Sequence, residues 1–87
     1  MVKGLLEQKL IACATMIPHV ESMYHWEGKI EHGNEVKVIL KTRESLFEKT
    51  RDYIEKNCSY DVPEIMEVKV ERGNPRYQKW ILDETQQ

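Results

Sequence analysis

The chain has 87 residues and a formal net charge of −2 at neutral pH, which is enough for one small domain over residues 1–87 with a limited core. Because Lys and Arg form no block, the charge pattern argues against nucleic acid and the membrane surface as partners. The chain has only two cysteines and no apolar run near 20 residues, and Met1–Glu7 lacks the apolar segment of a signal peptide. These features predict a cytoplasmic protein with free thiols.

The first half of the chain predicts a helix followed by a long hairpin. Apolar residues three and four positions apart indicate a helix over Val2–Ala14. Alternation then predicts strands over Thr15–Ile30 and Glu35–Lys41, joined by a turn at Glu31–Asn34. The alternation assigns two sets of residues to one face each: Met16, Val20, Tyr24 and Trp26 in the first strand, and Val36, Val38 and Leu40, as a buried face, in the second.

The second half predicts a helix, a strand and a further helix. Ser45 and Glu48 have the spacing of a capping box and open a helix that ends near Asn57. The alternating run Glu64–Val70 predicts a third strand. Gly73-Asn74-Pro75 then supplies the turn, the cap and the first residue of a terminal helix. Its inward face is expected to carry Tyr77, Trp80 and Ile81.

This order of elements favours an α+β sandwich, in which helices cover one face of an antiparallel sheet. One more strand before the first helix would complete the β-α-β-β-α-β order of a ferredoxin-like fold. The sequence as given does not contain that strand.

Few residues are arranged for chemistry. There is no Gly-rich phosphate loop and no Cys-x-x-Cys pair, and the three histidines (His19, His25 and His32) are interpreted as solvent-facing strand residues. Cys13, between two alanines, is expected to be a small buried filler. Cys58 follows a predicted helix end, where it is either a free loop thiol or a thiolate ligand of the kind that favours Cu(I).

The acidic and basic residues do not predict an enzyme. Glu27, Asp61 and Glu64 are candidate acids and Lys29 and Lys41 candidate bases, but no spacing pairs them as a general acid and base. Trp26 and Trp80 are interpreted as core or interface anchors, because no basic groove accompanies them.

Several motifs together resemble one protein family. They are IACATMIP at residues 11–18, SMYHWEGK at 22–29, ILKT at 39–42, YDVPEI at 60–65, GNPRY at 73–77, and Trp80. In this order and over nearly the whole chain, they resemble the CutA family of divalent-cation-tolerance proteins.

The resemblance implies a ferredoxin-like fold in a tight homotrimer similar to the PII signalling proteins, with long hairpins that pair with neighbouring subunits. It links bacterial members to tolerance of copper and other divalent metals, mammalian relatives to the handling of acetylcholinesterase, and no member to a catalysed reaction. It also implies a cleft between subunits, lined at the matching positions by Tyr24, Trp26, Glu27, Lys41, Tyr60, Glu64 and Trp80.

The chain departs from the family pattern in two places. Relatives begin with a β-strand that is central in the sheet, so we expect this chain to be an N-terminally truncated domain in which Glu64–Val70 lacks its main partner. Many bacterial members carry His-His-Pro-Tyr where this chain has Asn57-Cys58-Ser59-Tyr60. A copper site would therefore depend on Cys58 as the substitute ligand.

Two hypotheses follow. The first is a non-enzymatic, trimeric CutA-like protein that binds copper, another divalent cation or a small ligand in the cleft between subunits. The alternative is a trimeric scaffold that presents a surface to a protein partner, with the cleft residues purely structural.

Overall fold

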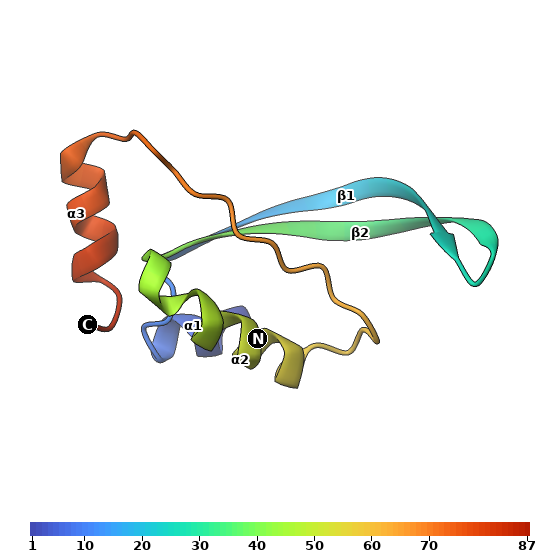
Figure 1. Ribbon diagram of the computed structural model, residues 1–87, viewed down its shortest axis with the longest axis horizontal. Coiled ribbons are helices and arrows are strands. Elements are labelled where there is room, and N and C mark those ends of the chain that lie inside the picture. Colours follow the sequence, from blue (N-terminus) through green and yellow to red (C-terminus); the bar gives the residue numbers. More distant parts are fainter.

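The structure, a computed structural model that describes residues 1–87, joins a long β-hairpin to a helical layer at one end of it (Figure 1). The elements in chain order are α1 (Val2–Glu7), β1 (Cys13–Trp26), β2 (Lys29–Lys41), the 3-10 helix η1 (Glu44–Leu46), α2 (Phe47–Asn57) and α3 (Pro75–Asp83). The predicted α+β class is confirmed, with a sheet of two antiparallel strands. No helix has the length and apolarity needed to cross a membrane.

The hairpin turns at Glu27-Gly28, not at Glu31–Asn34 as the sequence pattern predicted. Trp26 pairs with Lys29, and the two residues between them have positive φ angles of 51° and 77°. Positive φ at both central residues is the feature of a type I′ turn, whose twist matches that of the flanking strands. Gly33 and Asn34 instead lie within β2, opposite Ser22 and Glu21.

A bulge in β1 explains why the predicted strand face is wrong. Ile17 pairs with Lys37 and Val20 with Glu35, so Pro18 and His19 together oppose a single residue, and His19 has a φ of 60°. The extra residue reverses the alternation. Val20, Tyr24 and Trp26 therefore share a face with Ile17, and Met16 lies on the other face.

The helix α1 ends at Glu7, seven residues before the predicted end at Ala14. Lys9 adopts a φ of 57°, which turns the chain out of the helix and towards β1. Leu10 and Ile11, which follow the helix, are nevertheless buried. The apolar spacing therefore predicted correctly that these side chains are buried, although the backbone at Leu10 and Ile11 is not helical.

The predicted second helix is confirmed at its end but not at its cap. α2 ends at Asn57, whose side-chain amide Nδ2 donates a hydrogen bond of 2.8 Å to the Tyr53 backbone carbonyl. At the other end the chain enters through η1, and Ser45 makes no capping hydrogen bond. Because the 3-10 turn already occupies Ser45, its side chain is not in the N-cap position that a capping box needs.

Residues 64–70 are not a strand, contrary to the prediction. The segment has no partner in the sheet, and it carries three strongly exposed apolar side chains, Met66, Val68 and Val70. Ile65 contacts the core, and Lys69 forms an ion pair of 3.0 Å with Glu44. A strand requires a hydrogen-bonded neighbour, so the alternation of this run correctly marks an extended segment but not a ladder.

The helix α3 begins at Pro75 as predicted, but none of its residues is buried. Tyr77 and Trp80, expected on an inward face, are 38% and 41% exposed. Beyond the helix, Thr85 is buried and accepts a hydrogen bond of 2.9 Å from Arg43 Nε. The Gln86 amide donates to the Lys9 carbonyl at 2.8 Å, which ties the end of the chain to the α1–β1 loop.

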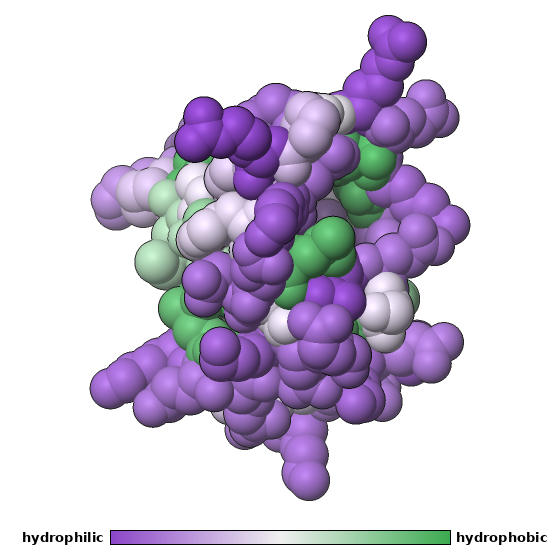
Figure 2. Space-filling model, turned by 90° about the vertical axis from the view of Figure 1, so that its left-hand side faces the viewer, coloured by the Kyte–Doolittle hydropathy of each residue, from purple (hydrophilic) through white to green (hydrophobic).

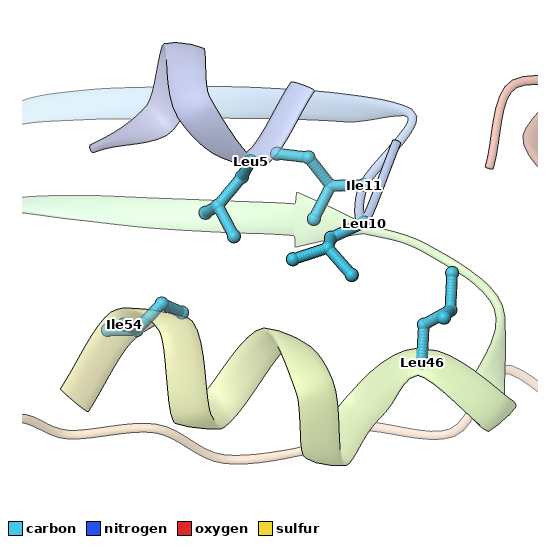
Figure 3. Close-up of a cluster of buried hydrophobic side chains, with 5 residues drawn as sticks. All are labelled: Leu5, Leu10, Ile11, Leu46 and Ile54. Atoms are coloured by element: carbon cyan, nitrogen blue, oxygen red, sulfur yellow. The ribbon is translucent and has the colours of Figure 1, made fainter. Parts of the chain in front are cut away.

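The core lies where α1, α2 and the start of the hairpin meet (Figure 3). Five side chains form it: Leu5, Leu10, Ile11, Leu46 and Ile54. Ala14 and Leu40, one pair of the ladder, pack against these residues. Of the predicted buried face of β2, only Leu40 is mostly covered, since Val36 and Val38 are 55% and 38% exposed.

Substitutions at two glycines test the position of the turn. Gly28→Ala places a side chain at a φ of 77°, so we expect the free energy of unfolding to fall by about 1 kcal/mol. Gly33→Ala is the matched control, because a Cβ there lies 3.5 Å from the Tyr24 hydroxyl, an ordinary contact, and strands disfavour glycine. Urea denaturation should show an unchanged or higher stability for Gly33→Ala. A larger loss at Gly33 than at Gly28 would contradict this turn.

Candidate functional site

Three of the residues expected in the cleft lie at the turn end of the hairpin. Tyr24 and Trp26 share one face, 47% and 44% exposed, and Glu27 is the first residue of the turn. The Tyr24 ring lies against Gly33 of β2, where the absence of a side chain leaves it room. The type I′ turn and the bulge fix this face, because both set which side chains alternate onto it.

Lys41 and Trp80 lie at the other end of the hairpin, joined through Tyr77. The Lys41 ammonium donates a hydrogen bond of 3.3 Å to the Tyr77 hydroxyl and lies 5.4 Å from the centre of its ring. Tyr77 in turn stacks on Trp80, with ring centroids 5.5 Å apart and planes 27° apart. These residues, with Cys13 opposite Lys41 in the ladder, form what we call the base cluster.

The base cluster keeps Lys41 charged. The hydrogen bond to the Tyr77 hydroxyl, with further contributions from the charges of Tyr77 and Cys13, raises the pKa of Lys41 above its usual value. No carboxylate forms an ion pair with this ammonium. A permanent cation beside two half-exposed aromatic rings offers a place for an anionic or aromatic group.

Tyr60 and Glu64 lie neither at the turn end of the hairpin nor in the base cluster. They follow α2 on the extended segment, and Tyr60 is 63% exposed. Cys58, at the end of α2, is half-buried and contacts the apolar core, so it is less exposed than its loop position predicted. Cys13 lies in a strand rather than a helix and is also half-buried.

The seven expected cleft residues therefore do not form a cleft within one chain. Trp26 pairs with Lys29 and Cys13 with Lys41, so the two ends of the ladder are twelve β2 residues apart, about 40 Å at the rise of a strand. The whole molecule is only 45 Å long. Trp26 and Lys41 can share a ligand only if different copies of the chain supply them.

No metal centre forms within one chain either. No group of three or more His, Cys, Asp and Glu side chains is placed to hold a metal ion. His32 Nε2 lies 3.8 Å from a Glu21 carboxylate oxygen, a pair that supplies only two possible ligands. Two surface depressions of about 390 Å³ each also lack the expected cleft residues. One is lined by Gln8, Leu10, Lys49, Asp52, Tyr53, Lys56 and Gln86, and the other by Glu44, Ser45, Phe47, Glu48 and Glu67.

The end of the molecule that carries α3 is mainly hydrophilic (Figure 2). Apolar residues appear there as separate patches among hydrophilic residues. On the hairpin, by contrast, large apolar side chains are exposed on both faces.

Tyr77, which links Lys41 to Trp80, was not among the residues expected in the cleft. Its spacing of three from Trp80 placed the two rings on one helix face, which was interpreted as an inward face. The pairing of Cys13 with Lys41 could not be read from the sequence, because it depends on the turn and the bulge together.

Known proteins resemble the chain over almost its full length. The family model described as "CutA1 divalent ion tolerance protein" matches residues 1–84. The chain is 48% identical over 84 residues to the divalent-cation tolerance protein CutA of Pyrococcus horikoshii, which covers 97% of this chain and 81% of the relative. It is 41% identical over 81 residues to a CutA homologue of Xenopus laevis, which covers 93% of this chain and 54% of that protein.

A solved structure agrees with the sequence comparison. The crystal structure of CutA1 from Oryza sativa superposes with a TM-score of 0.94 at 36% identity, over 98% of this chain and 78% of that one. The relatives are thus longer than this chain, and it spans about half of the Xenopus protein.

The Lys41–Tyr77 hydrogen bond predicts a measurable change. Tyr77→Phe should lower the pKa of Lys41 towards its usual value, observed by NMR titration of the lysine ¹³Cε signals. Lys69 is the internal control, because its own pKa is raised chiefly by a hydrogen bond to Glu44 and should not move. An unchanged Lys41 titration would contradict the role given to Tyr77.

The raised pKa of Lys41 also fixes how the stability of the fold changes with pH. Because the pKa of Lys41 is higher in the folded chain, its contribution to stability is complete below the unfolded value of about 10.4. It is lost as the pH rises through the folded value. Tyr77→Phe should therefore reduce the loss of folding stability that occurs as the pH rises above about 10.4.

Proposed function

This chain belongs to the CutA1 divalent ion tolerance protein family, and from that premise we propose that it acts as a non-enzymatic homotrimer that binds a divalent cation or small ligand between subunits. The observation that carries the proposal is the separation of the expected cleft residues to opposite ends of one hairpin. A shared site then needs the turn end of one copy beside the base cluster of the next. The cytoplasmic location stays a prediction.

The exposed apolar surface of the hairpin supports assembly. Large apolar residues are exposed on both faces: Ile17, Tyr24, Trp26 and Ile39 on one, and Met16, Met23, Ile30, Val36 and Val38 on the other. A two-stranded hairpin of this length is marginal in water unless something covers it. A closed symmetric assembly covers such faces and the strand edges together.

The chemistry of the two ends supports binding rather than catalysis. One end offers Tyr24, Trp26 and the Glu27 carboxylate, and the other offers the Lys41 ammonium beside Tyr77 and Trp80. These groups recognise charge and aromatic surface. The Tyr77 hydroxyl does have the Lys41 amine within hydrogen-bond reach, but the raised pKa of Lys41 makes this amine a proton donor and not the base that a covalent mechanism requires.

Copper is the metal proposed, with Cys58 as its ligand. Because the neighbours of Cys58 within the chain are core residues, one chain does not fit a metal ion there. A site at Cys58 would need at least one further ligand from a second subunit. Thiolate ligands favour Cu(I), which makes this the ion to test.

Trp26→Ala tests the assembly. If Trp26 anchors a subunit interface, we expect the trimer to dissociate at concentrations where the unmodified chain is trimeric, because removing a buried Trp costs about 3–5 kcal/mol. Light scattering after size exclusion measures the mass. Ile30→Ala, on the other face of the turn end, is the comparison.

The same variant distinguishes two roles of Trp26. A trimer that persists in Trp26→Ala but loses its ligand identifies Trp26 as part of a binding site, whereas loss of the trimer identifies it as an interface anchor. An unmodified chain that is monomeric at high concentration would contradict the proposal as a whole.

Copper titration tests Cys58 separately. Cys58→Ser should weaken Cu(I) affinity at least about tenfold, because a hydroxyl is a far poorer ligand than a thiolate for this ion. Cys13→Ser is the matched control and should bind as the unmodified chain does. Equal affinities in all three proteins, measured against a chromophoric chelator, would exclude Cys58 as a ligand.

A further inference from the structure

Two neighbouring cations, Lys41 and Arg43, contact opposite ends of α3. The Lys41 ammonium donates a hydrogen bond of 3.3 Å to the Tyr77 hydroxyl, in the first turn of the helix. Arg43 donates from Nη2 to the Leu82 carbonyl and from Nε to the Thr85 hydroxyl, the second bond at 2.9 Å. One guanidinium therefore binds both the last turn of α3 and the chain just beyond it.

The spacing of these contacts fits a helix attached to the chain at two points. Tyr77 and Leu82 are five residues apart, about 7.5 Å along a helix axis. Lys41 and Arg43 are two residues apart, about 7 Å in an extended chain, and the backbone at Arg43 is extended. Because the two spans match, both contacts form at once. One contact would let the helix pivot, whereas two contacts fix its direction.

The chemistry at the end of α3 suits a cation. The last carbonyls of a helix lack partners within the helix and lie at the negative end of its dipole. Arg43 is half-buried and forms no ion pair with a carboxylate, so these oxygens are its partners. Thr85 is only 2% exposed, and its hydroxyl donates a hydrogen bond of 2.9 Å to the Ile81 carbonyl. That bond directs a lone pair of the hydroxyl to Arg43.

The chain beyond Thr85 is anchored as well. The Gln86 backbone amide donates to the Lys9 carbonyl at 2.8 Å, and its side-chain amide donates to the Gln8 carbonyl at 2.8 Å. These bonds connect the end of α3 to the loop between α1 and β1. Arg43 therefore holds a segment that is fixed on its other side, not a loose end.

We propose that Arg43 and Thr85 position α3 so that the base cluster forms before any ligand binds. Tyr77 and Trp80 belong to this helix, so its direction decides whether their rings lie beside Lys41. A preformed cluster leaves less ordering to the binding step. This role rests on the proposed function, because the base cluster is one half of the site proposed between subunits.

Arg43→Lys and Thr85→Val together test this role without a change in charge. The first variant loses the fork that makes two hydrogen bonds, and the second keeps the side-chain volume but loses the hydroxyl. In the unliganded double variant, we expect the pKa of Lys41 to fall as far as it does in Tyr77→Phe, measured from the lysine ¹³Cε signals. Thr85→Ser keeps the hydroxyl and should leave this pKa raised.

The Tyr77→Phe background separates positioning from a direct effect on Lys41. If Arg43 and Thr85 act through α3 and Tyr77, the double change should add no further decrease in this background. Arg51→Lys is the matched control, since its guanidinium hydrogen-bonds to Asp52 on α2, and it should leave the pKa of Lys41 unchanged. Methyl signals of the core side chains show that each variant is folded.

Two results would overturn the proposal. One is a Lys41 pKa that stays raised in the folded double variant, and the other is a decrease of the same size with and without Tyr77→Phe. If the double variant does not fold, Thr85→Val alone is judged by the same two criteria. Light scattering of these samples reports the trimer separately, and no ligand is present. A failure of the proposed assembly is therefore distinguishable from a failure of this role.

Discussion

The antiparallel pairing of β1 with β2 is the interaction on which the rest of this structure depends. It is the only sheet in the chain. Its base, at Ala14 and Leu40, closes the core formed by α1 and α2. The hairpin beyond that base has nothing packed on it within the chain, and its stability there rests on the ladder and on two special positions, the Glu27-Gly28 turn and the bulge at Pro18-His19.

Those two positions also decide which residues can act together. A type I′ turn two residues long gives the hairpin its full length, and the bulge brings Tyr24 and Trp26 onto the face of Ile17. Had the turn been at Glu31–Asn34, the strands would be shorter and Trp26 would pair with a different residue. The separation of Trp26 from Lys41, and with it the need for a second copy, is therefore a consequence of the turn.

The sequence was informative where a local signal and the fold agree, and misleading where a single backbone angle decides. Pro75 at a helix start and Asn57 at a helix end were predictable, because both act through local chemistry. The turn was not, since Gly33-Asn34 is the stronger turn signal and only Glu27, with a φ of 51°, reveals the competing site. The strand at 64–70 failed for a different reason: alternation reports an extended chain, whereas a strand also needs a partner. Of the candidate site, the aromatic and charged residues could be named from the resemblance, but their separation along the hairpin could not.

The hydrophobic core is small compared with the apolar surface that the chain exposes. Only seven of the 87 residues are buried, and five of these are apolar. A hydrophobic effect confined to so few side chains stabilises a chain of this size weakly, since conformational entropy grows with every ordered residue. The apolar side chains that would normally supply the rest, on the hairpin and at 66–70, are present but face outwards. Their alternation is kept, which is the pattern of surfaces made to be covered by other strands. If the proposed assembly forms, it supplies the burial that one chain lacks, and a site built between subunits then exists only in that assembly.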